Sequence, residues 1–155
     1  MYYNNISFRN RVLNKIFNPY KQLHLDLYLK CLYLKCLDLS YNITDVSMLG
    51  NVNTLDLSWC YNITDVSMLG NIHTLNLTCC YKITDVSTLG NVHTLNLTCC
   101  DNITDVSALG NVYELNLSYC DKITDVSMLG NVHTLDLRGC HKITDIKCTN
   151  TLFIL

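Results

Sequence analysis

Apolar residues recur along most of the chain with a fixed spacing of 20 positions. Each unit follows the pattern V-x-x-L-x-L-x-x-C-x-x-I-T-D-V-S-x-L-G-N, and the period does not slip between copies. Self-similarity at a fixed period of this size is typical of stacked repeat architectures. Five consecutive copies begin at Tyr41, Tyr61, Tyr81, Asp101 and Asp121, and a sixth begins at His141 and drifts after Cys148.

The hydrophobic pattern changes within each unit. Leu55 and Leu57 alternate with polar residues, and alternation over about five residues predicts a strand with one buried face. The apolar positions that follow, such as Ile63 and Val66, are three residues apart, which favours a short 3-10 turn. Gly70 comes directly after this turn, where we expect a left-handed residue to end it.

A single unit has too few inward side chains to fold by itself, so neighbouring units must stack. We expect parallel strands about 4.8 Å apart in successive coils. The predicted fold is an α/β solenoid with parallel β-strands on its concave face and short 3-10 or turn segments on its convex face. The inward side chains of one unit are Val52, Leu55, Leu57, Cys60, Ile63, Val66 and Leu69.

The pattern LxxLxLxxC, carried by Val52, Leu55, Leu57 and Cys60 and by the same positions of the later copies, resembles the leucine-rich repeat family. The resemblance covers roughly residues 34–155. The C-x-x-I-T-D segment is similar to the cysteine-containing subclass found in F-box proteins, and I-T-D-V-S-x-L-G-N is similar to internalin repeats. The near-identical copies also resemble repeat proteins of large DNA viruses and amoebae. The resemblance implies a binding surface on the concave strand face.

The N-terminal segment differs from the repeats in charge and pattern. Residues 1–35 contain six basic residues and one acidic residue, whereas residues 36–155 contain five basic and twelve acidic residues. Residues 7–17 place their apolar side chains on one face of a predicted helix. We divide the chain into an N-terminal basic helix with a degenerate cap, 1–33, and a leucine-rich repeat solenoid, 34–155, whose last repeat is incomplete. A remnant of an F-box and a helix that docks on acidic partners or membranes are the alternatives for 1–33.

The C-terminal residues resume the strand pattern. Leu152 and Leu155 fall in register with Val132 and Leu135, so we expect the last strand there. This strand would present an apolar edge, and exposed strand edges invite pairing. The alternatives are a truncated or frayed end and an end that self-associates.

Ten cysteines occur in the chain. The column that includes Cys60 points inward, where a thiol acts as a small apolar group with a weak donor. By the resemblance, it takes the place of an asparagine that ties each turn to its neighbour. Cys79 and Cys99 precede this column by one residue, so we expect them on the open side. They could form a bridge between coils, but no secretory signal is visible and we expect reduced thiols.

Two polar columns are candidates for metal binding. His73, His93 and His133 share a column that we expect to form an exposed lip of the strand face. The aspartate column that includes Asp65 precedes each short turn, where a carboxylate accepts hydrogen bonds from backbone N–H groups. A row of carboxylates that gathers cations is the alternative. Neither column has the convergent spacing of a metal site, so we predict no metal and no cofactor.

The residues at the outward strand positions are small, polar and almost uncharged. The positions that vary between otherwise identical copies are therefore more informative about binding. Aromatic residues dominate binding hot spots. We therefore predict a protein-binding patch in the variable columns, with neutral drift among recent duplicates as the alternative. The candidate protein-binding residues are Trp59, Tyr61, Tyr81, Tyr119, Glu114 and Arg138.

These patterns predict a non-catalytic protein-protein interaction module with a protein partner. The net charge of −2 argues against a nucleic-acid partner, and no apolar run is long enough for a membrane span. No nucleophile with an adjoining base is evident, so we predict no enzyme activity. The alternative function is an F-box-like adaptor that recruits substrates to a ubiquitin ligase. We expect a cytoplasmic location, in the host cytoplasm if the protein is viral.

Overall fold

The computed structural model describes residues 43–144 and the backbone of residues 152–154. Every described residue belongs to one compact unit, Tyr33–Leu155. The helix predicted over 7–17, the degenerate cap and the boundary at residue 33 all lie outside the described residues.

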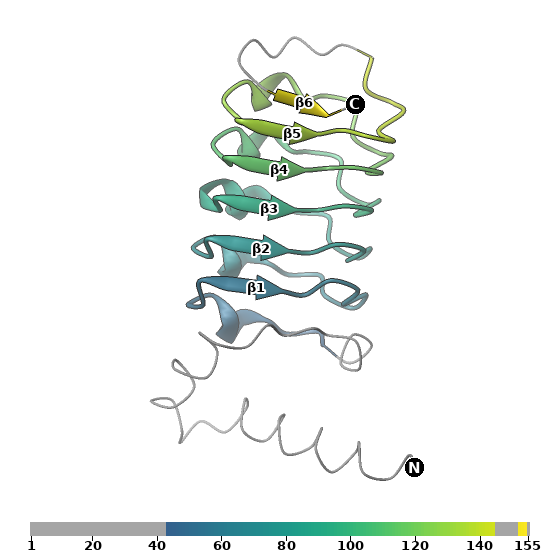
Figure 1. Ribbon diagram of the computed structural model, residues 1–155. Coiled ribbons are helices and arrows are strands. Elements are labelled where there is room, and N and C mark those ends of the chain that lie inside the picture. The colour runs from purple at the N-terminus through teal and green to yellow at the C-terminus, as the bar shows by residue number, and fades with distance from the viewer. Residues whose placement is uncertain (1–42, 145–151, 155) are drawn as a thin grey trace, which may run out of the picture. The chain divides into compact units, whose positions relative to one another are not determined.

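Short 3-10 helices alternate with strands of three residues along the repeats. The strands form one parallel sheet in the order β1 to β6, so each strand pairs with its neighbours in the sequence. Figure 1 shows the strands stacked on one side of the coils and the 3-10 turns behind them. This is the predicted solenoid. Its elements are η2 (Ser47–Leu49), β1 (Thr54–Asp56), η3 (Ser67–Leu69), β2 (Thr74–Asn76), η4 (Ser87–Asn91), β3 (Thr94–Asn96), η5 (Ser107–Leu109), β4 (Glu114–Asn116), η6 (Ser127–Leu129), β5 (Thr134–Asp136) and β6 (Leu152–Ile154).

The inward columns form one continuous core. All seven inward positions predicted for the unit beginning at Val52 are buried, and the equivalent positions of the next units are buried as well. Leu75 and Leu95, for example, are each 1% exposed and pair in register between β2 and β3. Because each coil covers the apolar side chains of the next, the core depends on stacking rather than on any single unit.

The strands are shorter than the five residues predicted, although hydrogen bonding between coils continues beyond them. Leu57 donates from its backbone N–H to the carbonyl of Asn76 (2.8 Å), and Trp59 donates to the carbonyl of Thr78 (2.7 Å). These bonds lie after β1, where the chain has already begun to turn. These hydrogen bonds extend the ladder three residues past the end of β1, to Trp59. They hold the following turn against the next coil.

The register predicted for the last strand is wrong by two residues. β6 pairs with β5 so that Leu152 lies opposite Thr134 and Phe153 lies opposite Leu135. The incomplete last coil is therefore two residues shorter than the coils before it. Phe153 takes the position in the ladder that the prediction assigned to Leu155.

The left-handed position of each unit is not the glycine after the 3-10 turn, as the sequence predicted. Gly70 and Gly110 have φ values of −64° and −61°, which are right-handed helical. The left-handed residues lie three positions after the end of each strand and include Trp59 with φ 66° and Tyr119 with φ 59°. The chain reverses there, at the end of the ladder, so the unusual backbone conformation falls on a varied column of the repeat.

Close approach between coils explains the glycine column instead. A Cβ atom at Gly110 would collide with the backbone carbonyl oxygen of Met128 in the next coil. Gly50, Gly70 and Gly90 face the corresponding carbonyl in the same way. Only a residue without a side chain permits this contact, so the column is conserved between copies for packing rather than for its backbone freedom.

The aspartate column caps the short turns, as predicted. Asp65 accepts a hydrogen bond from the backbone N–H of Ser67 (2.9 Å), and Asp105 accepts one from Ser107 (2.9 Å). Asp45, Asp85 and Asp125 make the same contact. The hydrogen bond from the serine backbone, followed by that from its hydroxyl, lowers the pKa of each of these five carboxyl groups. Asp145 lies outside the described residues.

This capping predicts that the protein loses stability in acid. Each of the five carboxyl groups has a lower pKa in the folded chain than its ordinary value of 3.8. Such a group stabilises the fold above the unfolded pKa, and this contribution is lost as the pH falls through the folded pKa. We expect the Tm, followed by circular dichroism, to fall as the pH is lowered from about 5 to about 2.

A neutral cap provides the control for this acid effect. Asp105→Asn keeps an oxygen acceptor for the N–H of Ser107 but removes the charge, so its Tm should fall less steeply with pH than that of the parent chain. Asp121→Asn, at an exposed aspartate away from the 3-10 helices, should leave the slope unchanged. Equal slopes for all three proteins would contradict the capping role.

The inward cysteine column ties each coil to its predecessor, as the sequence predicted. The thiol of Cys100 donates to the carbonyl of Leu77 (3.1 Å), and the thiol of Cys120 donates to that of Leu97 (3.1 Å). Burial raises the pKa of both thiols, for Cys120 to about 12. These cysteines are therefore neutral structural donors inside the core. Cys80 and Cys140 make the same bond to Leu57 and Leu117.

Candidate functional site

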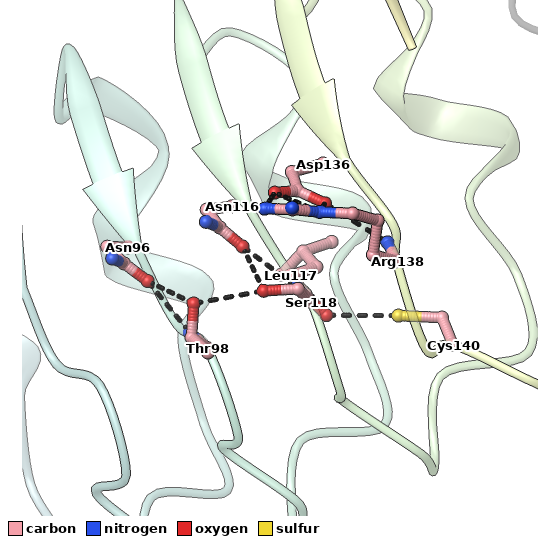
Figure 2. A network of polar contacts seen from close by, with 8 residues as sticks. All are labelled: Asn96, Thr98, Asn116, Leu117, Ser118, Asp136, Arg138 and Cys140. Carbon is pink, nitrogen blue, oxygen red and sulfur yellow. Dashed lines mark hydrogen bonds and ion pairs between the residues drawn. The ribbon is translucent and has the colours of Figure 1, made fainter. Parts of the chain in front are cut away.

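The strand face carries a polar floor whose side chains are already hydrogen-bonded to one another. Asn96 accepts bonds from the backbone N–H (2.9 Å) and the hydroxyl (2.6 Å) of Thr98. Asn116 binds Ser118 in the same way, and the hydroxyls of Thr98 and Ser118 are 3.1 Å apart across the coils. Figure 2 shows this chain of contacts running from one coil to the next. The floor is thus preorganised and has little freedom to adapt.

An ion pair ends this polar floor at β5. Arg138 forms a salt bridge to the carboxylate of Asp136 (2.6 Å), which is buried at the position held by asparagine in the two preceding coils. Hydrogen bonds from the Arg138 side chain hold the pKa of Asp136 below its usual range. The predicted site residue Arg138 is exposed, but its guanidinium already has a carboxylate partner.

An aromatic cluster, formed by Trp59, Tyr61 and Tyr81, lies just after the strands. The Trp59 and Tyr61 rings meet edge to face at 6.3 Å between centroids, and the Tyr61 and Tyr81 rings stack at 5.5 Å. Trp59 is 46% exposed. The structure therefore brings together three of the six predicted site residues, on the flank where the sequence placed them.

The other three predicted residues do not join this cluster. Tyr119 is 57% exposed but lies in the column of Trp59 with two cysteine positions between them. Glu114 is exposed at the opposite end of the strands, where its carboxylate accepts a bond from the Thr94 hydroxyl (3.3 Å). Arg138 lies beside Asp136. The six residues are therefore spread over the strand face and do not form a single patch.

A second column of rings lies before the strands and is exposed. The sequence predicts an exposed lip at these positions, with weak metal binding as the alternative. The rings of His73 and His93 stack at 4.5 Å, those of His93 and Tyr113 at 4.8 Å, and those of Tyr113 and His133 at 4.5 Å. The signal was present in the sequence, because planar side chains in one column of a 20-residue repeat must lie one coil apart. We call these four residues the ring stack.

Cys79 does not lie on the open side of the strands, contrary to the sequence prediction. It is 4% exposed, and Cys99 in the next coil is half-buried. The strand alternation ends before these positions, because both residues adopt the left-handed conformation with φ near 60°. A hydrogen bond with the Cys79 thiol, together with burial, raises the pKa of Tyr81 to about 12. The phenol is therefore neutral and lies beside the thiols.

In the part of the chain that the structure describes, no group of three or more His, Cys, Asp or Glu side chains could hold a metal ion together. A cavity of about 220 Å³ lies between η5 and η6, and its carboxylates, Asp105 and Asp125, cap the two turns. Among the described residues, no helix is long and apolar enough to cross a bilayer.

The repeats match known proteins. A family model for the leucine-rich repeat matches residues 91–110 and 111–129. Internalin C2 from Listeria monocytogenes is 30% identical, with a TM-score of 0.54 over 72% of this chain and 56% of its own. A second Listeria internalin, InlF, is 29% identical over 61% of this chain and 31% of its own, with a TM-score of 0.49.

A third structure, the functional domain of InlJ from Listeria monocytogenes, includes a cysteine ladder. It is 24% identical over 68% of this chain and 34% of its own, with a TM-score of 0.39. No curated protein matches the chain. The chain thus spans between about a third and just over half of the length of these internalin structures.

The parallel strand ladder, the 3-10 turns and the inward leucine columns agree with the family model and with the internalin C2 structure. The repeats of this chain therefore have the fold and the sequence pattern of leucine-rich repeats.

Proposed function

We propose that this protein is a non-catalytic interaction module that binds another protein through the aromatic cluster and the adjoining polar floor of its strand face. The observation that carries the proposal is the cluster itself. Trp59 stays 46% exposed although its ring already contacts Tyr61, which in turn stacks on Tyr81. Tryptophan and tyrosine are the side chains most enriched in binding hot spots.

The rigidity of the surface supports this function. Trp59 is anchored by its backbone hydrogen bond to Thr78 and by its left-handed backbone, so its ring starts from a fixed position. The polar floor beside it is already hydrogen-bonded. A preorganised surface has less conformational freedom to lose on binding, which improves affinity for a given contact area.

Two parts of this proposal follow from the sequence more than from the fold. We keep a cytoplasmic location, which suits the seven cysteines of the described part, all of them free thiols. We also keep the absence of enzyme activity and of a nucleic-acid partner. The F-box-like adaptor rests on the C-x-x-I-T-D segment of the repeats and on a docking helix in residues 1–33, which lie outside the described residues, and it stays a prediction. Self-association through the C-terminal edge stays a prediction as well.

The test is affinity capture from the producing cells followed by titration of the partner that is recovered. Trp59→Asn with Tyr81→Ala should weaken binding at least about tenfold, because both hot-spot rings are lost. Asparagine is chosen at position 59 because it tolerates the positive φ that alanine does not. Circular dichroism and Tm should show that the fold persists.

A matched control removes exposed apolar surface elsewhere. Met68 and Met128 are 58% and 63% exposed at η3 and η6, away from the strands. Met68→Ala with Met128→Ala should leave binding unchanged. Unchanged binding of every specific partner by the aromatic variant, with the fold intact, would refute the proposal.

A further inference from the structure

Cys79 and Cys99 form a pair of thiols outside the inward cysteine column, and Cys79 also has a hydrogen bond with the phenol of Tyr81. They occupy equivalent positions in neighbouring coils, and the backbone N–H of Cys79 donates to the carbonyl of Thr98, next to Cys99 (2.8 Å). Their φ values of 60° and 58° are nearly equal, so their Cα–Cβ bonds point in the same direction. Cys79 is buried and Cys99 is half-buried, which leaves a route from solvent to the pair through Cys99.

The spacing of the coils suits a bridging ion better than a disulfide. Equivalent atoms of adjacent parallel strands lie about 4.8 Å apart, and the rings of His73 and His93 in the same two coils are 4.5 Å apart. A disulfide needs its sulfurs about 2.05 Å apart, so two side chains that leave the backbone in parallel at this spacing would have to turn toward each other. Two metal–sulfur bonds of about 2.3 Å placed in line span about 4.6 Å, close to the coil spacing.

The number of ligands limits which ion could bind there. Zinc prefers four ligands in a tetrahedron, and the described residues contain no group of three or more suitable side chains. Soft thiolates select Cu(I), an ion that accepts two ligands. From this geometry we infer that Cys79 and Cys99 bind one Cu(I) ion as a two-coordinate dithiolate.

The chemistry of binding is a proton exchange without oxidation. Each thiol releases one proton to solvent as its sulfur bonds to Cu(I), and the copper remains Cu(I) throughout. Burial, and then the neighbouring Cys79, raises the pKa of the Cys99 thiol, so Cys99 is protonated before the ion arrives. Asp101 and Asp121 add negative charge near Cys99, which favours a cation in this position.

The inward cysteine column has the same coil spacing but does not compete for the ion. Cys80 and Cys100 are 0% exposed and donate their thiol hydrogens to the carbonyls of Leu57 and Leu77. An ion would have to enter a packed core and break these bonds. The inward cysteine column is therefore an internal control for the pair, because its thiols have the same spacing between coils but an ion in solvent cannot reach them.

The inference is tested by anaerobic titration with Cu(I) against the chelator bicinchoninate. The full chain carries Cys31→Ser, Cys36→Ser and Cys148→Ser, which removes the three cysteines outside the described residues. We expect about one equivalent of Cu(I) to be retained, and its affinity to rise with pH as the thiol protons leave. Cys79→Ser or Cys99→Ser should each lower the affinity at least roughly 100-fold, since even residues behind a ligand are worth 10–100-fold.

Moving one thiol along its column separates the proposed geometry from a simple count of cysteines. Cys79→Ser with Tyr119→Cys places thiols in adjacent coils at 99 and 119 and should restore binding. Cys99→Ser with Tyr119→Cys keeps the same number of thiols two coils apart and should not. Equal Cu(I) binding by both variants, or retention of the ion by Cys79→Ser with Cys99→Ser, would overturn the inference. Partner binding is measured separately, so failure here leaves the proposed function standing.

Discussion

Replacing Gly110 by alanine is expected to lower the free energy of unfolding by about 2–3 kcal/mol, as overpacking in a tight interior does. The new Cβ would meet the carbonyl oxygen of Met128, which belongs to the backbone of the next coil and cannot rotate away. The two coils could separate only by stretching the hydrogen bonds that join their strands. Urea unfolding followed by circular dichroism measures the change.

Asn111→Ala, one residue further along the same turn, is the matched control for this substitution. Gly110 has φ −61° and ψ −15°, a conformation that alanine adopts freely, so the expected loss comes from the contact with Met128 and not from backbone strain. Asn111 is exposed, so its substitution should change the free energy of unfolding by less than about 0.5 kcal/mol. A loss of stability at Asn111 equal to that at Gly110 would show that any substitution in this turn, and not the contact between coils, causes the effect.

Cys100→Ala is expected to lower the free energy of unfolding by about 1–2 kcal/mol, through a small cavity and a lost hydrogen bond. The carbonyl of Leu77 would retain only its bond from the backbone N–H of Cys80 (3.0 Å). Cys100→Ser keeps a donor at the same place and should cost less. Urea unfolding again provides the measurement.

Cys99→Ser is the control for the inward column, because this neighbouring thiol is half-buried and lies outside it. It should change the free energy of unfolding by less than about 0.5 kcal/mol, as substitutions away from the core usually do. If Cys100→Ala proves no more destabilising than Cys99→Ser, the inward thiols do not tie the coils together.

Because most positions of the repeat are the same in nearly every copy, the residues that differ between copies lie in a few columns. Positions that pack coil on coil, such as the leucines, glycines and capping aspartates, are the same in nearly every copy. The left-handed column instead reads Trp59, Cys79, Cys99, Tyr119 and Gly139. Each of its side chains projects from a turn that the backbone already holds in place. The aromatic cluster and the thiol pair both draw on this column, which makes it the variable surface of a uniform framework.

The aromatic cluster could be predicted from the sequence, whereas the overlap of the rings in the ring stack and the burial of Cys79 could not. The aromatic cluster was expected because Tyr61 and Tyr81 occupy one column and Trp59 lies two residues from it. The ring stack was visible as a column, but the degree of ring overlap depends on side-chain rotation, which a period does not contain. The burial of Cys79 was missed because strand alternation was carried one residue too far, into a turn with positive φ.

The solenoid, its parallel ladder, the inward columns and the aspartate caps could all be predicted from the repeat pattern. These follow from a strict 20-residue period, because a translation along the chain becomes a translation between coils. The contacts between the backbones of neighbouring coils appear only in the tertiary structure. The glycine contact, the left-handed column and the pairing of Phe153 with Leu135 depend on distances between coils. Those distances arise only when neighbouring units pack, so no pattern within a single unit contains them.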